Sequence, residues 1–309
     1  MAHVTFIHGI SNMPPEPDLH RLWREALADG DDAVPLGDLG IASSFVYWAD
    51  VLYADPETDL AAYEGVVENR AAAVDGAGDS TLPIAATPEE QAFLDRLRSR
   101  LTGLDEAEIA AGHEPSSVQG ALERVPLPWF VKRPFLAAFL RDVHHYLFDV
   151  EHVPRHGTTF WVQQEIRRRF LAKLTDPAVT RPHIVVAHSM GTVIAYDCLK
   201  RVGDCVAVDG IMTLGSPLGL DEVQDKLQPG WTREDGFPAD RLAGGWLNLF
   251  DRLDPVCGFD PALANDYRRA GAMTVTDQAV RNPGAWRHSL GKYLRQPAVR
   301  VGLRQLLQL

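Results

Sequence analysis

The residues from 184 to 195 have the pattern that could place a serine nucleophile. The β-branched run Ile184–Val186 predicts a strand, and the apolar run after Gly191 predicts a helix. Ser189 is then expected at the tight corner between strand and helix, in a strained backbone conformation with its hydroxyl exposed above the sheet. Ala187 and Gly191 are small enough for the two elements to pass close together. The simpler alternative is that Ser189 only caps the helix.

A serine hydroxyl needs a general base within hydrogen-bond reach, and a carboxylate must orient that base. The stretch Ala187–Gly191 resembles the nucleophile elbow of the α/β-hydrolase superfamily, in the Ala-x-Ser-x-Gly form that some lipases carry. In that superfamily the nucleophile, the acid and the histidine follow one another along the chain. The resemblance therefore implies Ser189, Asp254 and His288, and His288 is the only histidine after Ser189.

The identity of the acid leaves alternatives open. The turn Asp254–Val256 is similar to the Asp-x-Val turn that carries the acid in many hydrolases. Asp251 lies three residues earlier, at the expected end of the strand, and Asp260 is a weaker candidate. An acid drawn from the preceding strand would be Asp221. We rank Asp254 first, then Asp251, then Asp221.

The resemblance also implies an oxyanion hole, which is a pair of backbone N–H groups that bind a developing negative charge. Its donors would be Ile10, in the turn after the first strand, and Met190, next to the nucleophile. Gly9 would let the loop bend, and His8 would brace it. The resulting site needs no side chain from these two donor residues.

Other residues are expected to line the site without taking part in the chemistry. Ser216 is a rival nucleophile, but Pro217 follows it at once and the strand-turn-helix context is missing, so this loop is interpreted as a wall of the site. The side chain of His188 is expected to leave the corner in another direction, which excludes it as the base. The residues expected at the substrate are Gly9, His188, Ser216 and Pro217.

Apolar runs that alternate with helical patterns predict an α/β fold. Besides the strand before Ser189, we expect strands at 4–7, 44–48, 208–214, 246–250 and 272–276. The expected architecture is a mostly parallel central sheet flanked by helices, which the resemblance implies is the α/β-hydrolase fold. Residues 1–53 and 158–309 are assigned to this core, and 54–157 to a helical cap or lid insertion without a clear strand.

Two helices are expected within the insertion. Thr87–Glu90 is a capping box with a proline at the first helical position, and the helix after it carries Phe93, Leu94, Leu97 and Leu101 on one face. A second helix is expected from Pro134 to Val150. Their apolar faces could form an acyl pocket or a lid with transient lipid contact. The alternative is that they pack on each other and on the core.

Composition excludes several classes of function. The chain has 309 residues and a formal net charge of −12, so no basic surface for nucleic acid is expected. Its three cysteines are too few for a disulfide framework or a cysteine-rich zinc site. The chain opens on strand-like residues and has no run long enough for a transmembrane helix, so we expect a cytoplasmic protein without stable membrane insertion.

No metal or cofactor is expected. His144, His145, His152 and His156 cluster in the sequence, but they lack a recognisable ligand spacing. The expected function is a serine hydrolase that cleaves a small-molecule ester or a lipid through an acyl-enzyme. An amidase, a peptidase or a thioesterase would use the same residues. A non-catalytic binding protein of the same fold is the alternative from another class.

Overall fold

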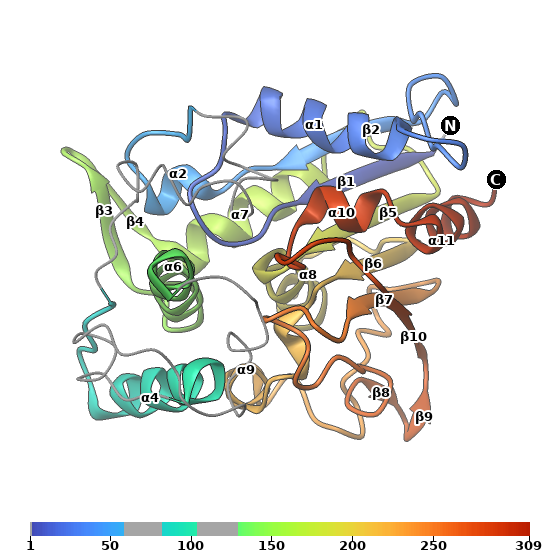
Figure 1. Ribbon diagram of the computed structural model, residues 1–309. Coiled ribbons are helices and arrows are strands. Elements are labelled where there is room, and N and C mark those ends of the chain that lie inside the picture. The colour runs from blue at the N-terminus through green and yellow to red at the C-terminus, as the bar shows by residue number, and fades with distance from the viewer. Residues whose placement is uncertain (1, 59–81, 104–128) are drawn as a thin grey trace.

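The computed structural model describes residues 2–58, 82–103 and 129–309. Its main strands are β1 (His3–Ile7), β2 (Ala42–Val46), β5 (His183–His188), β6 (Gly210–Leu214), β7 (Trp246–Asp251) and β10 (Val275–Val280). They form one six-stranded sheet in the order β10-β7-β6-β5-β1-β2, and every neighbouring pair is parallel (Figure 1). The prediction of an α/β fold with a mostly parallel central sheet is confirmed.

Helices pack on both faces of this sheet (Figure 1). On one face lie α1 (Glu16–Ala28), α10 (Leu290–Leu294) and α11 (Pro297–Leu307). The other face is covered by α7 (Val162–Leu174) and α8 (Met190–Arg201), with α4 (Pro88–Thr102), α6 (Trp129–Leu147) and α9 (Asp221–Leu227) beyond them. The short helices are α2 (Ala49–Leu52) and the 3-10 turn Pro217–Gly219. Within the described ranges, no helix has both the length and the apolar character needed to cross a membrane.

The apolar run of β5 follows from its position inside the sheet. Ile184 and Val186 belong to the core shared with α1, α10 and α11. Val185 and Ala187 belong to the core on the opposite face. A parallel strand covered on both faces needs apolar residues at consecutive positions, which is why the sequence shows no polar alternation here.

The two helices expected in the insertion are present, with both boundaries of the second one corrected. Thr87 Oγ1 accepts a hydrogen bond from the Glu90 N–H at 3.2 Å, as expected for the start of α4. Helix α6 runs from Trp129 to Leu147, so the expected start at Pro134 and the expected end at Val150 are both wrong. An interior proline removes one backbone donor and crowds the carbonyl four residues earlier, yet this helix continues through Pro134.

The apolar faces of α4 and α6 pack on each other, and both helices belong to the core on this side of the sheet. Phe93 and Leu97 of α4 lie in the same core cluster as Leu136 and Phe139 of α6, and Val185 of the sheet belongs to that cluster too. These side chains are therefore committed to the core. The alternative of mutual packing describes them better than a lipid-facing surface.

The expectation of no strand within 54–157 is wrong. An antiparallel hairpin is formed by β3 (Glu151–Arg155) and β4 (Thr158–Trp161), which pair only with each other. Its side chains are half-buried or exposed, so the sequence carries no buried apolar run there. The expected boundary between 157 and 158 falls in the turn of this hairpin, and the division into core and insertion stays a prediction. A second short pair, β8 (Arg268–Arg269) and β9 (Ala272–Met273), precedes β10.

Candidate active site

The loops that follow four neighbouring strands meet at one edge of the sheet. Gly9 follows β1, Ser189 follows β5, Gly215 follows β6 and Asp254 follows β7. The carboxyl ends of parallel strands lie at the same edge, which is where open α/β sheets bind their ligands. His288 reaches this edge from the loop between β10 and α10.

Ser189 occupies a strained corner between β5 and α8. Its backbone has φ 53° and ψ −129°, and its N–H donates to the Leu214 carbonyl at 3.0 Å. Such a conformation costs a non-glycine residue about 1–3 kcal/mol, and the surrounding structure must hold it in place. The Ser189 side chain makes no capping hydrogen bond to α8, so the alternative that it only caps the helix is wrong.

Two glycines allow the chain to pass this corner. A Cβ on Gly191 would lie 2.5 Å from the His8 carbonyl oxygen, and one on Gly9 would lie 2.5 Å from Ser189 Cβ. Real Cβ atoms do not approach other atoms so closely. The loop after β1 therefore packs directly against the serine, and it does so because both positions lack a side chain.

The structure brings Ser189, His288 and Asp254 together. His288 Nε2 lies 2.8 Å from Ser189 Oγ, and His288 Nδ1 lies 2.9 and 2.8 Å from the two carboxylate oxygens of Asp254. Because a carboxylate only accepts, Nδ1 carries the proton and Nε2 is left to accept from the serine hydroxyl. The arrangement gives the serine a base and gives that base a fixed orientation.

These three side chains are buried, which corrects the expectation of an exposed hydroxyl. The exposed fractions are 0% for Ser189, 1% for Asp254 and 5% for His288. The Phe135 ring of α6 lies beside the histidine, with ring centroids 5.9 Å apart. The Phe135 ring also contacts the Trp286 ring edge-on, with centroids 4.7 Å apart. The local sequence around Ser189 does not determine how exposed its hydroxyl is, because elements distant in the chain cover it.

The Asp254 carboxylate is held in its charged form. Burial alone would raise its pKa, but the charge of His288 and hydrogen bonds from His288, the Val256 N–H and the Tyr293 hydroxyl together lower the pKa. The last two bonds are each 2.8 Å long. A Cβ on Gly215 would lie 2.9 Å from Asp254 Oδ2, so this position also has to be small.

The competing carboxylates serve other contacts. Asp251 accepts from the Asn282 N–H at 2.7 Å and from the Arg287 guanidinium at 3.1 Å, which fixes the loop that leads to His288. Asp221 forms an ion pair with Arg100 at 3.2 Å. For Asp260, burial and then the charges of Asp266 and Asp221 raise the pKa to about 6.

His188 and Ser216 lie close to the three residues without joining their hydrogen bonds. The His188 ring stacks on the His288 ring, with centroids 4.7 Å apart, and burial lowers the pKa of His188 well below its usual range. The hydroxyl of Ser216 lies 2.7 Å from that of Thr192 on α8. The Thr192 hydroxyl itself donates to the Ser189 carbonyl at 2.7 Å, so the Ser216 hydroxyl donates toward the helix.

The loop from His8 to Ser11 is held at both ends. The Trp48 N–H donates to His8 Nε2 at 3.0 Å, and burial lowers the pKa of His8 to about 3, which keeps this ring neutral. The Ser11 N–H donates to Asp142 on α6 at 2.8 Å. Between these ends, the Ile10 N–H has no acceptor within the described part of the chain, and the same is true of the Met190 N–H.

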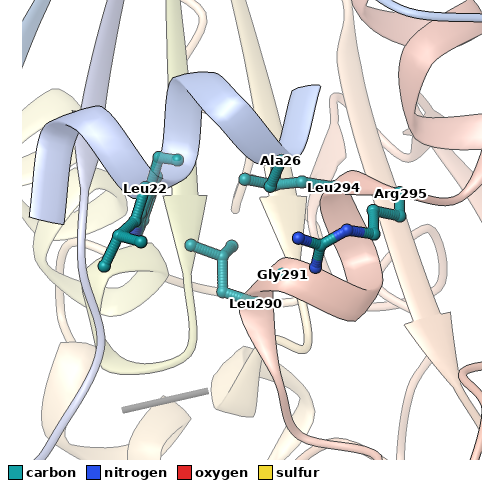
Figure 2. Close-up of a pocket in the computed structure, with 7 residues that line it drawn as sticks. Leu22, Ala26, Leu290, Gly291, Leu294 and Arg295 are labelled. Carbon is teal, nitrogen blue, oxygen red and sulfur yellow. The ribbon is translucent and has the colours of Figure 1, made fainter. Parts of the chain in front are cut away.

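A separate pocket lies between α1 and α10 (Figure 2). It is lined by Leu22, Trp23, Ala26, Leu290, Gly291, Leu294 and Arg295. None of the residues at the edge described above belongs to it. Its lining is mostly apolar, and Arg295 at its rim pairs with Asp29.

Sequence reasoning missed two residues of this site. Tyr293 donates to Asp254, but nothing in the pattern of α10 marks it, because the contact depends on tertiary folding. Asp142 did carry a signal. It lies among the apolar positions Phe139, Val143 and Tyr146 of α6, and a charged residue on a buried face needs partners.

One comparison with known proteins agrees with the α/β fold described above. A model described as "Alpha/beta hydrolase family" matches residues 118–305. No curated protein matches the chain. One solved structure, an uncharacterized protein from Pseudomonas aeruginosa, is 10% identical over 91% of this chain, which spans 40% of that protein's length. Its TM-score is 0.31, and the likeness carries no argument.

Proposed function

The chain belongs to the alpha/beta hydrolase family and is a hydrolase of that superfamily, and from this premise we propose that it is a serine hydrolase of carboxylic esters. The observation that carries the proposal is the continuous hydrogen-bonded series from Ser189 through His288 to Asp254, with contacts of 2.8–2.9 Å. A neutral imidazole between a hydroxyl and a buried carboxylate is the arrangement that activates serine for attack on a carbonyl.

In the proposed mechanism, His288 Nε2 takes the proton of Ser189 as its oxygen attacks the ester carbonyl. The charge of Asp254 then stabilises the imidazolium through Nδ1. His288 returns the proton to the alcohol oxygen as the C–O bond breaks, which leaves an acyl group on Ser189. Water repeats the sequence in the second half, releasing the acid and restoring the serine.

The tetrahedral intermediate needs donors for its negative oxygen. We assign this role to the backbone N–H groups of Ile10 and Met190, because both flank Ser189 and neither has an acceptor in the described residues. Losing one such donor costs about 3–4 kcal/mol of transition-state stabilisation.

The surroundings of His288 suggest the kind of ester. Because His288 protonates the leaving alcohol, the aromatic side chain of Phe135, which lies beside His288, would lie beside that half of the substrate. An apolar alcohol group fits this position. A net charge of −12 also favours a neutral substrate over a polyanionic one.

Hydrolysis of p-nitrophenyl esters from short to long acyl chains tests the proposal. We expect turnover by the wild type and a loss of at least about 1,000-fold in Ser189→Ala, because removing the nucleophile abolishes the acyl-enzyme route. Ser44→Ala is the matched control, since Ser44 bonds to Thr5 and His3 on the sheet and lies away from His288. A p-nitroanilide with the same acyl group separates an esterase from an amidase. Substantial activity in folded Ser189→Ala would refute the proposal.

A further inference from the structure

Asp142 is a fully buried carboxylate that joins α6 to the loop beside Ser189. Its exposed fraction is 0%, and Oδ2 accepts the Ser11 N–H at 2.8 Å. The Tyr53 hydroxyl and the Arg141 guanidinium, at 3.1 and 3.2 Å, are its other donors. Ser11 itself has φ 80°, a backbone conformation that a side chain-bearing residue keeps only where neighbours hold it.

We propose that Asp142 is a positioning residue, which aims the Ile10 N–H at the reacting carbonyl oxygen by fixing the adjacent Ser11 N–H. The inference rests on the proposed function and adds to it that α6 completes the oxyanion hole. Ile10 lies between two held points, His8 on the Trp48 side and Ser11 on the Asp142 side. Its own N–H has no acceptor in the described residues, so its direction depends on these neighbours.

The cost of burying this charge argues against a role in packing alone. Taking a carboxylate out of water is expensive, and an apolar residue of similar volume often stabilises a core better. Here each donor comes from a different place: the loop after β1, the segment after α2, and α6 itself. A charge-assisted hydrogen bond to a backbone N–H is short and directional, which suits the orientation of a peptide group.

The test compares Asp142→Ala with Asp142→Asn and with His144→Ala. Asn keeps an oxygen that can accept from Ser11, and Ala does not. His144→Ala is the matched control because it removes a buried contact of the same helix, the 2.9 Å bond to Glu90, on a side away from the loop. The readouts are kcat and KM per active site titrated with a fluorophosphonate, and hydrogen-deuterium exchange of the peptide covering 8–12.

We expect Asp142→Ala to lower kcat about 10- to 100-fold with KM within about threefold, since misaiming one donor loses part of an oxyanion contact. Exchange of the 8–12 peptide should rise. Asp142→Asn should retain most of the wild-type kcat and most of the wild-type protection of the 8–12 peptide. The kcat of His144→Ala per titrated site should lie within about twofold of the wild-type value.

Three results would overturn the inference: an unchanged kcat in folded Asp142→Ala, unchanged exchange of the loop, or an equal loss of kcat in His144→Ala. Failure of the proposed function looks different. In that case Ser189→Ala would still hydrolyse the ester. Faster hydrogen-deuterium exchange of the 8–12 peptide in Asp142→Ala would nevertheless still show that Asp142 holds the loop in the wild type.

Discussion

At the scale of single residues, the orientation of His288 depends on how firmly Asp254 is held. The Tyr293 hydroxyl donates to Asp254 Oδ2 at 2.8 Å and accepts from the Asp251 N–H at 3.0 Å. One buried hydroxyl therefore connects the proposed acid with the strand end that precedes it. The His188 ring stacks on the His288 ring and so supports His288 from a second direction.

Tyr293→Phe should weaken both activity and stability. It leaves the Asp251 N–H without its acceptor, which costs about 1–3 kcal/mol of unfolding free energy, and it frees the Asp254 carboxylate to rotate. We expect kcat/KM to fall about three- to tenfold, which is the worth of one hydrogen bond to Asp254. Tyr196→Phe is the matched control, because it removes an equally buried hydroxyl that donates to the Gly236 carbonyl. Equal losses of kcat/KM in both variants would contradict a role for Tyr293 in holding Asp254.

Asp260→Asn should stabilise the protein above about pH 6 but not at pH 4. Burial and the nearby acids raise the pKa of Asp260 to about 6, above the value of about 4 expected for an unfolded chain. The ionised group therefore opposes folding above pH 6, and this opposition disappears as the pH falls through 6 toward 4.

The gain in unfolding free energy should be at most about 1 kcal/mol at pH 8, because Asp260 is only half-buried and solvent screens its charge. At pH 4 the gain should be close to zero. Urea unfolding of Asp260→Asn at both pH values measures it, with the exposed Asp240→Asn as control. A gain at pH 4 that equals the gain at pH 8 would show that ionisation is not its cause.

At the scale of elements, three loops approach one another because glycines occupy the contact points. Gly9 after β1 and Gly191 in α8 allow the first loop to pack against the corner at Ser189. Gly215 after β6 has φ 56° and lies against Asp254 and His288. The geometry of the site is therefore determined by backbone approach as much as by its polar side chains.

Gly9→Ala should impair catalysis while the fold persists. Its Cβ would lie 2.5 Å from Ser189 Cβ and 3.1 Å from Oγ, so the loop or the serine must move by several tenths of an ångström. A displacement of this kind costs at least about tenfold in kcat, because attack requires close alignment. Gly203→Ala is the control, since nothing lies within 4 Å of its added Cβ. Wild-type kcat in Gly9→Ala would contradict the close packing of this loop.

At the scale of the whole molecule, α6 connects the helical layer with the edge of the sheet. Its Asp142 holds the loop after β1, its Phe135 lies beside His288, and its Tyr146 donates to Asp197 of α8 at 2.7 Å. Arg167 of α7 pairs with the same Asp197 carboxylate at 2.7 Å. The helices α6, α7 and α8 are thus joined by polar contacts at the buried Asp197 carboxylate.

The sequence predicts this molecule well where local pattern and burial coincide. The apolar run before Ser189 and the strand at 246–250 are recognisable because both are buried on two faces. The hairpin around Gly157 is not evident from the sequence, because its strands bury few side chains. The start of α6 is not evident either, because a proline such as Pro134 is typical of the first turn of a helix. Tyr293 depends on folding that brings distant segments together, which no short pattern encodes.

Reaction with a fluorophosphonate measures whether Ser189 is an activated nucleophile, and it needs no knowledge of the natural ester. Intact-mass spectrometry followed by peptide mapping would locate the adduct. We expect one adduct per chain, on Ser189, and none in Ser189→Ala. In His288→Ala, in which the general base is missing, the adduct should form at least about 100-fold more slowly. These results would support Ser189 as the nucleophile. An unlabelled wild type, or an adduct that persists in Ser189→Ala, would contradict this assignment.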